Sequence, residues 1–163
     1  MTTIRGHYQN AYVTHDTDRA AEVLTKACGL TDWRTFEVEF PVQTQQGELL
    51  QATKVAIAWG GGLQVELIQP VSGFIDPFLT YLPADKADLS PRFHHISLRR
   101  ESMDEIEAEI AALGLPVVCR GGIPDLQYVY LDARPSLGHY LELVWASPAG
   151  WEMVGWPEGL EML

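Results

Sequence analysis

The stretch Arg92-Phe93-His94-His95-Ile96-Ser97-Leu98-Arg99 decides the fold, because it marks the point where the order of elements along the chain begins again. Its composition is typical of a β-strand, and Ser102, just beyond it, opens a helix. Neighbouring residues on a regular strand point to opposite faces, so His94 and His95 cannot share one role. We expect His95 to face a cleft and His94 to face packing or solvent.

Downstream of this strand, the sequence predicts one helix and three further strands. Ser102 and Glu105 form a capping-box pattern, and apolar residues then recur on one stripe up to Leu113, before Gly114. The strands are expected at residues 116–120, 126–131 and 139–145, separated by turns rich in Gly and Pro. The second half of the chain therefore reads βαβββ.

The first half has the same order. A strand is expected at residues 7–14, a helix from Asp16 to Gly29, and strands at 33–42, 49–59 and 63–68. A linker at residues 70–91, with helical character at 75–82, separates the halves.

This internal repeat predicts an α+β fold of two βαβββ modules that pair around a shared cleft. Residues 1–85 would form the first module with the linker, and residues 86–163 the second with a C-terminal tail. Gln9 precedes the helix opener Asp16 by seven residues, as His95 precedes Ser102. The modules could pair within one chain or across a dimer.

Composition and charge exclude some function classes. The formal net charge of −11 argues against nucleic acid, whose phosphates need clustered Lys and Arg. The N-terminus has no apolar signal-peptide core, and no apolar run is long enough for a membrane span. Cys28 and Cys119 have no metal or redox spacing, so reduced thiols in the cytoplasm are expected rather than a disulfide.

Four polar residues occupy equivalent points of the two modules: Gln9 and Glu66 in the first, His95 and Glu142 in the second. Both glutamates lie in otherwise apolar strands, where a buried carboxylate costs free energy unless something compensates it. Two carboxylates, an imidazole and an amide make a plausible site for one divalent metal ion.

The sequence resembles the vicinal oxygen chelate superfamily, which includes glyoxalase I, methylmalonyl-CoA epimerase, extradiol dioxygenases and bleomycin-resistance proteins. The resemblance spans about residues 7–144 and is closest to the epimerase and glyoxalase I-like members. It rests on the helix start at Asp16–Ala20, the acidic strand at Glu66–Ile68, the linker and double-histidine strand from Phe78 to Ser97, and the closing Gly138 with Glu142–Val144.

The resemblance implies that Gln9, Glu66, His95 and Glu142 bind Zn, Ni, Co or Mn, and we expect a homodimer. The set is similar to that of zinc-type lactoylglutathione lyases, whereas the epimerases more often begin with histidine. This difference leaves the epimerase match good in the linker and imperfect at the ligands.

A divalent ion at this site would polarise a carbonyl, so we predict an isomerase, epimerase or lyase that removes the adjacent proton from a small molecule. Glu142 or Glu66 would be the base, and family analogy favours Glu142. Arg99, Tyr128 and Tyr140 are candidates for substrate contact.

Two alternatives remain. A non-catalytic drug-binding protein of the bleomycin-resistance kind would suit the acidic charge, but it has no use for buried carboxylates without a cation. An Fe(II) ring-cleaving dioxygenase would need a second histidine ligand, which Gln9 and Glu66 do not supply. The substrate could be a thioester, a hemithioacetal or a free keto acid.

Overall fold

The computed structural model describes residues 4–161, and the terminal residues 1–3 and 162–163 of the two predicted modules lie outside it. Eight strands form one closed barrel in the order β1-β4-β3-β2-β6-β7-β8-β5. The α+β fold of two βαβββ units is therefore confirmed. The elements in chain order are β1 (His7–Val13), α1 (Thr17–Cys28), β2 (Arg34–Thr44), β3 (Gly47–Gly60), β4 (Leu63–Gly73), α2 (Asp76–Leu79), β5 (Arg92–Arg99), α3 (Met103–Leu113), β6 (Val117–Ile123), β7 (Leu126–Leu131), α4 (Arg134–Leu137), β8 (Tyr140–Ala146) and α5 (Pro148–Met153).

The two halves meet where β1 pairs antiparallel with β5, and the register of this pair is itself symmetric. Gln9 lies opposite Ser97, and Ala11 lies opposite His95. Gln9 and His95 occupy equivalent positions in the two halves, and so do Ala11 and Ser97. The pair of Gln9 with Ser97 therefore corresponds to the pair of His95 with Ala11. Each of these strands also pairs in parallel with the last strand of its own half, β1 with β4 and β5 with β8.

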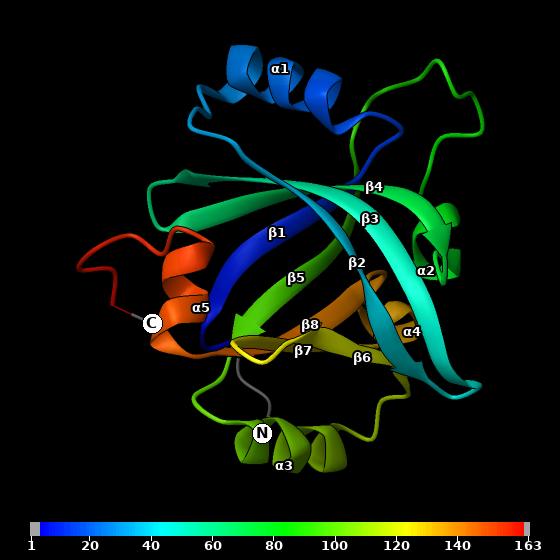
Figure 1. Ribbon diagram of the computed structural model, residues 1–163, viewed down its shortest axis with the longest axis vertical. Helices are drawn as coiled ribbons and strands as arrows, with labels where there is room; N and C mark the ends of the chain where they lie inside the picture. Colours follow the sequence, from blue (N-terminus) through cyan, green and yellow to red (C-terminus); the bar gives the residue numbers. More distant parts are fainter. Residues whose placement is uncertain (1–3, 162–163) are drawn as a thin grey trace.

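Helices cover opposite outer faces of the barrel (Figure 1). Ala20 of α1 packs on Ala56 and Leu67, and Ile106 of α3 packs on a second cluster that includes Leu98 and Leu143. The residues predicted to begin and end the helices do so. Asp16 and Ser102 are the N-caps of α1 and α3, and Gly29 and Gly114 end these helices with φ of 71° and 62°.

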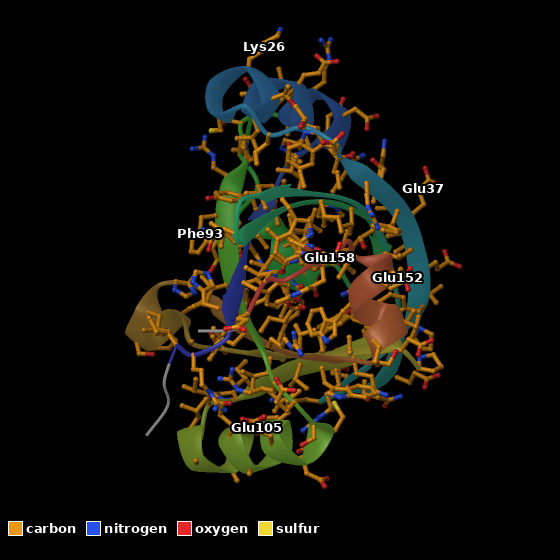
Figure 2. The ribbon with its side chains drawn as sticks, turned by 90° about the vertical axis from the view of Figure 1, so that its left-hand side faces the viewer. Lys26, Glu37, Phe93, Glu105, Glu152 and Glu158 are labelled. Carbon is orange, nitrogen blue, oxygen red and sulfur yellow. The ribbon has the colours of Figure 1, made fainter. Side chains whose placement is uncertain are left out.

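The strands alternate between outside and inside as their sequence predicts. Figure 2 shows Glu37 of β2 pointing away from the barrel. Its neighbours Phe36 and Val38 line an interior cavity. The two cysteines are free, as expected, with Cys28 exposed and Cys119 buried. Among the described residues, no helix is both long and apolar enough to span a membrane.

Some segments differ from the prediction. β4 runs on to Gly73, beyond the expected end at residue 68, because Gln51 and Ala52 of β3 continue to pair with it. The C-terminal tail forms α5 beside β8, a helix that the sequence did not predict. There, the Trp151 ring meets the ring of Tyr8 edge-on at 5.4 Å.

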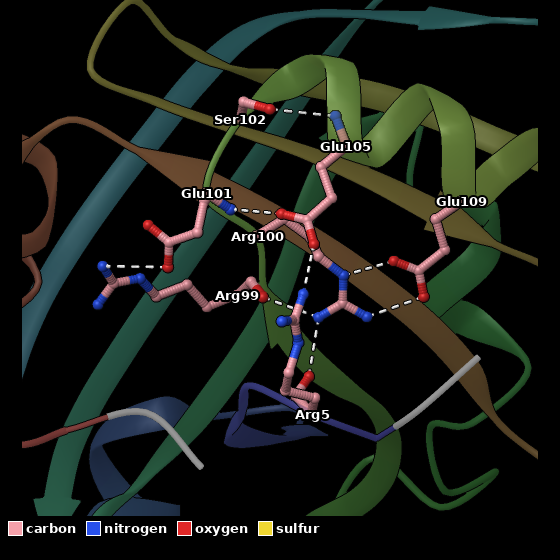
Figure 3. Close-up of polar contacts among 7 residues, drawn as sticks. All are labelled: Arg5, Arg99, Arg100, Glu101, Ser102, Glu105 and Glu109. Carbon is pink, nitrogen blue, oxygen red and sulfur yellow. Dashed lines mark hydrogen bonds and ion pairs between the residues drawn. The ribbon is translucent and has the colours of Figure 1, made fainter. Parts of the chain in front are cut away.

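A buried ion pair fixes α3 to the strand ends (Figure 3). The Arg100 guanidinium is almost fully buried, donates two hydrogen bonds to the Glu109 carboxylate, and donates further bonds to the carbonyls of Arg5 and Arg99. A buried charge of this kind depends on its partner because water cannot replace it.

We therefore expect Glu109→Ala to lower the free energy of unfolding by about 3 kcal/mol, since it leaves the Arg100 guanidinium unpaired. Urea unfolding measures this loss. The control is Glu107→Ala, which removes the exposed pair with Arg120 and should cost less than about 1 kcal/mol. Equal small losses in both variants would contradict the assignment of Arg100 as a buried, dependent charge.

Candidate metal and substrate site

The four residues predicted as metal ligands lie on four strands that are neighbours in the barrel, β4, β1, β5 and β8. His95 is fully buried, and its Nε2 atom lies 3.3 Å from Glu142 Oε2 and 3.7 Å from Glu66 Oε2. Gln9 is also buried and joins Glu142 through Ser97, whose hydroxyl oxygen contacts both side chains. The structure thus brings together residues that are up to 133 positions apart (from 9 to 142).

A β-bulge in β5 places the two histidines beside each other. Ala11 and Tyr12 of β1 pair with His95 and Phe93, so His94 is an extra residue in the ladder. Strict alternation therefore fails at this point. His94 is buried, as packing would require, but its Nδ1 atom lies 2.8 Å from the Nδ1 atom of His95.

Hydrogen bonding through His94 determines which nitrogen of His95 carries the proton. The Pro77 carbonyl can only accept, so His94 Nε2, 3.1 Å away, donates to it. Burial, followed by the charge of His95, lowers the pKa of His94 well below its usual value, which keeps the ring neutral. His94 Nδ1 is then an acceptor and His95 Nδ1 the donor. A neutral His95 therefore presents a bare Nε2 toward the two glutamates.

This arrangement fits a bound cation. His95 Nε2 is buried without a hydrogen-bond partner, and it faces two carboxylates that can also only accept when ionised. Donors bound to zinc at about 2.0–2.2 Å in a tetrahedral site stand roughly 3.5 Å apart, close to the separations seen here. Within residues 4–161, however, no three His, Cys, Asp or Glu side chains already adopt a formed metal-site arrangement. The support for a metal site is therefore the chemistry of the imidazole and the two carboxylates, and not a completed coordination sphere.

Among the four predicted metal ligands, Gln9 has hydrogen-bond partners at both of its polar side-chain atoms. Its Oε1 atom lies within hydrogen-bond distance of the Ser97 hydroxyl, which can donate to either Gln9 or Glu142, and its Nε2 atom donates to Gln64 Oε1 at 2.5 Å. Gln64 in turn donates to the Val154 carbonyl at 3.2 Å. Direct coordination by Gln9 stays a prediction, because in this arrangement its amide orients Glu142 through Ser97.

The electrostatics of the site favour neutral groups. Burial, and then the charge of Glu142, raises the pKa of Glu66 well above its usual value. Burial likewise raises the pKa of Tyr128 and of Tyr130. Both phenols are therefore protonated at neutral pH and can donate hydrogen bonds.

The glutamates face a cavity of about 210 Å³ inside the barrel. Tyr128 lines it and donates to Gln51 Oε1 at 3.2 Å, and Tyr130 lines it with its ring 4.9 Å from that of His95. The wall is otherwise mainly apolar. Its apolar side chains include Phe36, Val38, Phe40, Val55, Ile57, Ile68, Phe78, Leu126, Val144, Met153 and Val154.

The other two predicted substrate contacts lie away from this cavity. The Arg99 guanidinium lies 4.9 Å from both the Trp151 and Trp156 rings. Tyr140 packs beside His94, and its ring lies 4.6 Å from the Arg134 guanidinium. Among the three predicted contacts, only Tyr128 lines the cavity.

Sequence reasoning did not assign a role to Ser97 or Gln64. A signal for both was present, because each lies two residues from a predicted ligand and therefore on the same strand face. The contact between His94 and His95 had no such signal, because it depends on the bulge.

Residues 8–130 match the model of the Glyoxalase/Bleomycin resistance protein/Dioxygenase superfamily. No sequence among the curated proteins matches the chain at a significant level.

Similar solved structures include several methylmalonyl-CoA epimerases. One, in complex with methylmalonyl-CoA and NH4+, is 19% identical with a TM-score of 0.62, over 90% of this chain and 97% of that one. The Streptomyces coelicolor enzyme, as a variant in complex with 2-nitronate-propionyl-CoA, is 18% identical with a TM-score of 0.60, over 89% of this chain and 99% of that one. The Mycobacterium tuberculosis enzyme is 15% identical with a TM-score of 0.55, over 91% and 93%. At these identities the likeness establishes the fold.

The raised pKa of Glu66 predicts how the stability of the metal-free protein depends on pH. Below the unfolded-state pKa, the Glu66 carboxyl is protonated in both the folded and the unfolded protein and carries no charge penalty. As the pH rises through the raised folded-state pKa, ionisation of this buried carboxyl destabilises the fold. Thermal unfolding in chelator at pH 5 and pH 8 should therefore show Glu66→Gln gaining stability over the wild type as pH rises. The exposed Glu39→Gln is the control. A gap between Glu66→Gln and wild type that does not widen with pH would contradict this account.

Proposed function

Because the chain belongs to the Glyoxalase/Bleomycin resistance protein/Dioxygenase superfamily, we propose that it is a divalent-metal-dependent isomerase, epimerase or lyase. Its reaction would begin with removal of a proton from the carbon next to a carbonyl. The observation that carries this proposal is the buried Nε2 of His95, which has no hydrogen-bond partner and faces Glu66 and Glu142 at the base of the cavity.

His95, Glu66 and Glu142 would hold the metal, with Gln9 as the fourth predicted ligand. When bound, a divalent ion polarises a carbonyl oxygen and makes the neighbouring proton more acidic. Zn, Ni, Co and Mn are all compatible with an imidazole and two carboxylates.

Glu142 is the proposed base. Ser97 contacts its Oε2 atom, which is also the oxygen that lies 3.3 Å from His95 Nε2. This leaves Oε1 of Glu142 to take the proton from the substrate carbon and to return it.

The two other classes have less support. A dioxygenase site would require two histidines, but His94 directs its nitrogens to Pro77 and His95 rather than to the glutamates. A drug-binding protein would suit the apolar cavity, yet it gives no reason for two carboxylates beneath that cavity. The epimerases among the similar structures carry out one reaction of the proposed class.

We also propose that the protein acts in the cytoplasm as a homodimer.

Exchange of the substrate proton with solvent tests the role of Glu142. The probe is 2-hydroxyacetophenone in D2O with metal-loaded protein, and proton NMR follows loss of its CH2 signal. We expect Glu142→Gln to slow exchange by about 10²–10⁴-fold, while metal analysis still finds the ion bound.

Glu66→Gln is the matched comparison, because it neutralises the other carboxylate of the pair. Full exchange in Glu142→Gln together with loss in Glu66→Gln would move the base to Glu66. Full exchange in both would contradict carboxylate-mediated proton transfer.

A further inference from the structure

The charges around the cavity indicate which kind of substrate it can bind. This inference rests on the proposed function. Among residues 4–161, the only ionisable carboxylates lining the cavity are Glu66 and Glu142, and no Lys, Arg or His side chain lines it. Two carboxylates contribute −2, and one divalent ion would contribute +2, so the loaded site is neutral. A substrate carboxylate or phosphate would add a negative charge that nothing in the wall compensates.

Three cations near the barrel, Arg34, Arg99 and Lys54, do not line the cavity. Arg34 donates to the carbonyls of Glu152 and Met153 in α5 at 3.2 and 3.0 Å. Arg99 lies between two tryptophan rings, 4.9 Å from each. Lys54 pairs with Asp18 at 2.7 Å on the outer surface. An anionic group inside the barrel would therefore meet no Lys or Arg side chain in the part of the wall that residues 4–161 form.

Proton transfer preserves this neutrality. The proton leaves the substrate carbon, and the electron pair of the C–H bond stays on the substrate while the proton binds Glu142. The substrate gains the negative charge that the glutamate loses, so the total charge in the cavity does not change. A neutral substrate thus allows the reaction without a net charge in an apolar cavity at any stage.

The entrance is apolar as well. β2 pairs with β6 only at Gln43 with Arg120 and Thr44 with Cys119 in the described chain, so the rest of this edge is not closed by backbone hydrogen bonds. The cavity wall continues here into the half-exposed Phe40 and the more exposed Ile123 and Met153. The geometry of this opening suits an apolar group that enters between β2 and the β6–β7 hairpin.

We infer that the substrate is an uncharged compound whose carbonyl is attached to a compact apolar group. The size limit follows from the volume. An engineered apolar cavity of about 150 Å³ accommodates benzene, so a cavity of about 210 Å³ admits one substituted ring or a branched chain of similar size.

The test compares three probes that differ in charge at one position: 2-hydroxyacetophenone, its 4-carboxamide and its 4-carboxylate. The carboxamide has the size of the carboxylate without its charge. Isothermal titration at constant ionic strength, with metal-loaded and with metal-free full-length protein, should give at least tenfold tighter binding of the two neutral probes in both forms.

A variant pair locates the effect. Met153→Lys places a cation at the entrance and should strengthen binding of the carboxylate about tenfold. Val71→Lys makes the same change at an exposed position of β4 that does not line the cavity, and it should have no effect.

The outcomes separate the two proposals. Failure to bind any metal would overturn the proposed function, and the probe preference can still be judged on the metal-free protein. Equal or tighter binding of the carboxylate, no binding of either neutral probe, or the same response in both lysine variants would overturn the inference about the substrate.

Discussion

The antiparallel pairing of β1 with β5 is the constraint on which the rest of the structure depends. It joins the first strands of the two repeats, so each brings its own parallel partner, β4 or β8, to the same part of the barrel. Glu66 and Glu142 reach His95 for this reason, although they lie on the outer strands of the four. A single repeat has one of these carboxylates only, so the site exists because the halves are paired.

The pairing also links the site to the C-terminal tail. The Ser97 hydroxyl lies within hydrogen-bond distance of both Glu142 and Gln9. Gln9 donates to Gln64, and Gln64 donates to the Val154 carbonyl. Because that carbonyl can only accept, it orients the amide of Gln64, and Gln64 in turn orients Gln9. The tail after β8 thus helps to fix the amides beside Glu142, with which Val154 lines the same cavity.

Most of the fold could be predicted from the sequence because each half obeys simple periodicities. Two-residue alternation identified the strands, and Asp16 and Ser102 marked the helix starts. What alternation cannot predict is a bulge, and the two bulges of the β1–β5 pair lie at Tyr8 and His94. Each brings an extra side chain inside: Tyr8 lines the cavity beside Gln9, and His94 contacts His95. Tertiary packing decided these positions, which is why the local pattern does not contain them.

The central claim is that one divalent cation binds between His95, Glu66 and Glu142. Anomalous diffraction at the cobalt edge, from crystals grown with Co²⁺, tests it most directly. We expect one peak per chain within bonding distance, about 2.0–2.3 Å, of His95 Nε2 and of both carboxylates. A cobalt peak elsewhere, with no peak in contact with these three residues, would contradict it.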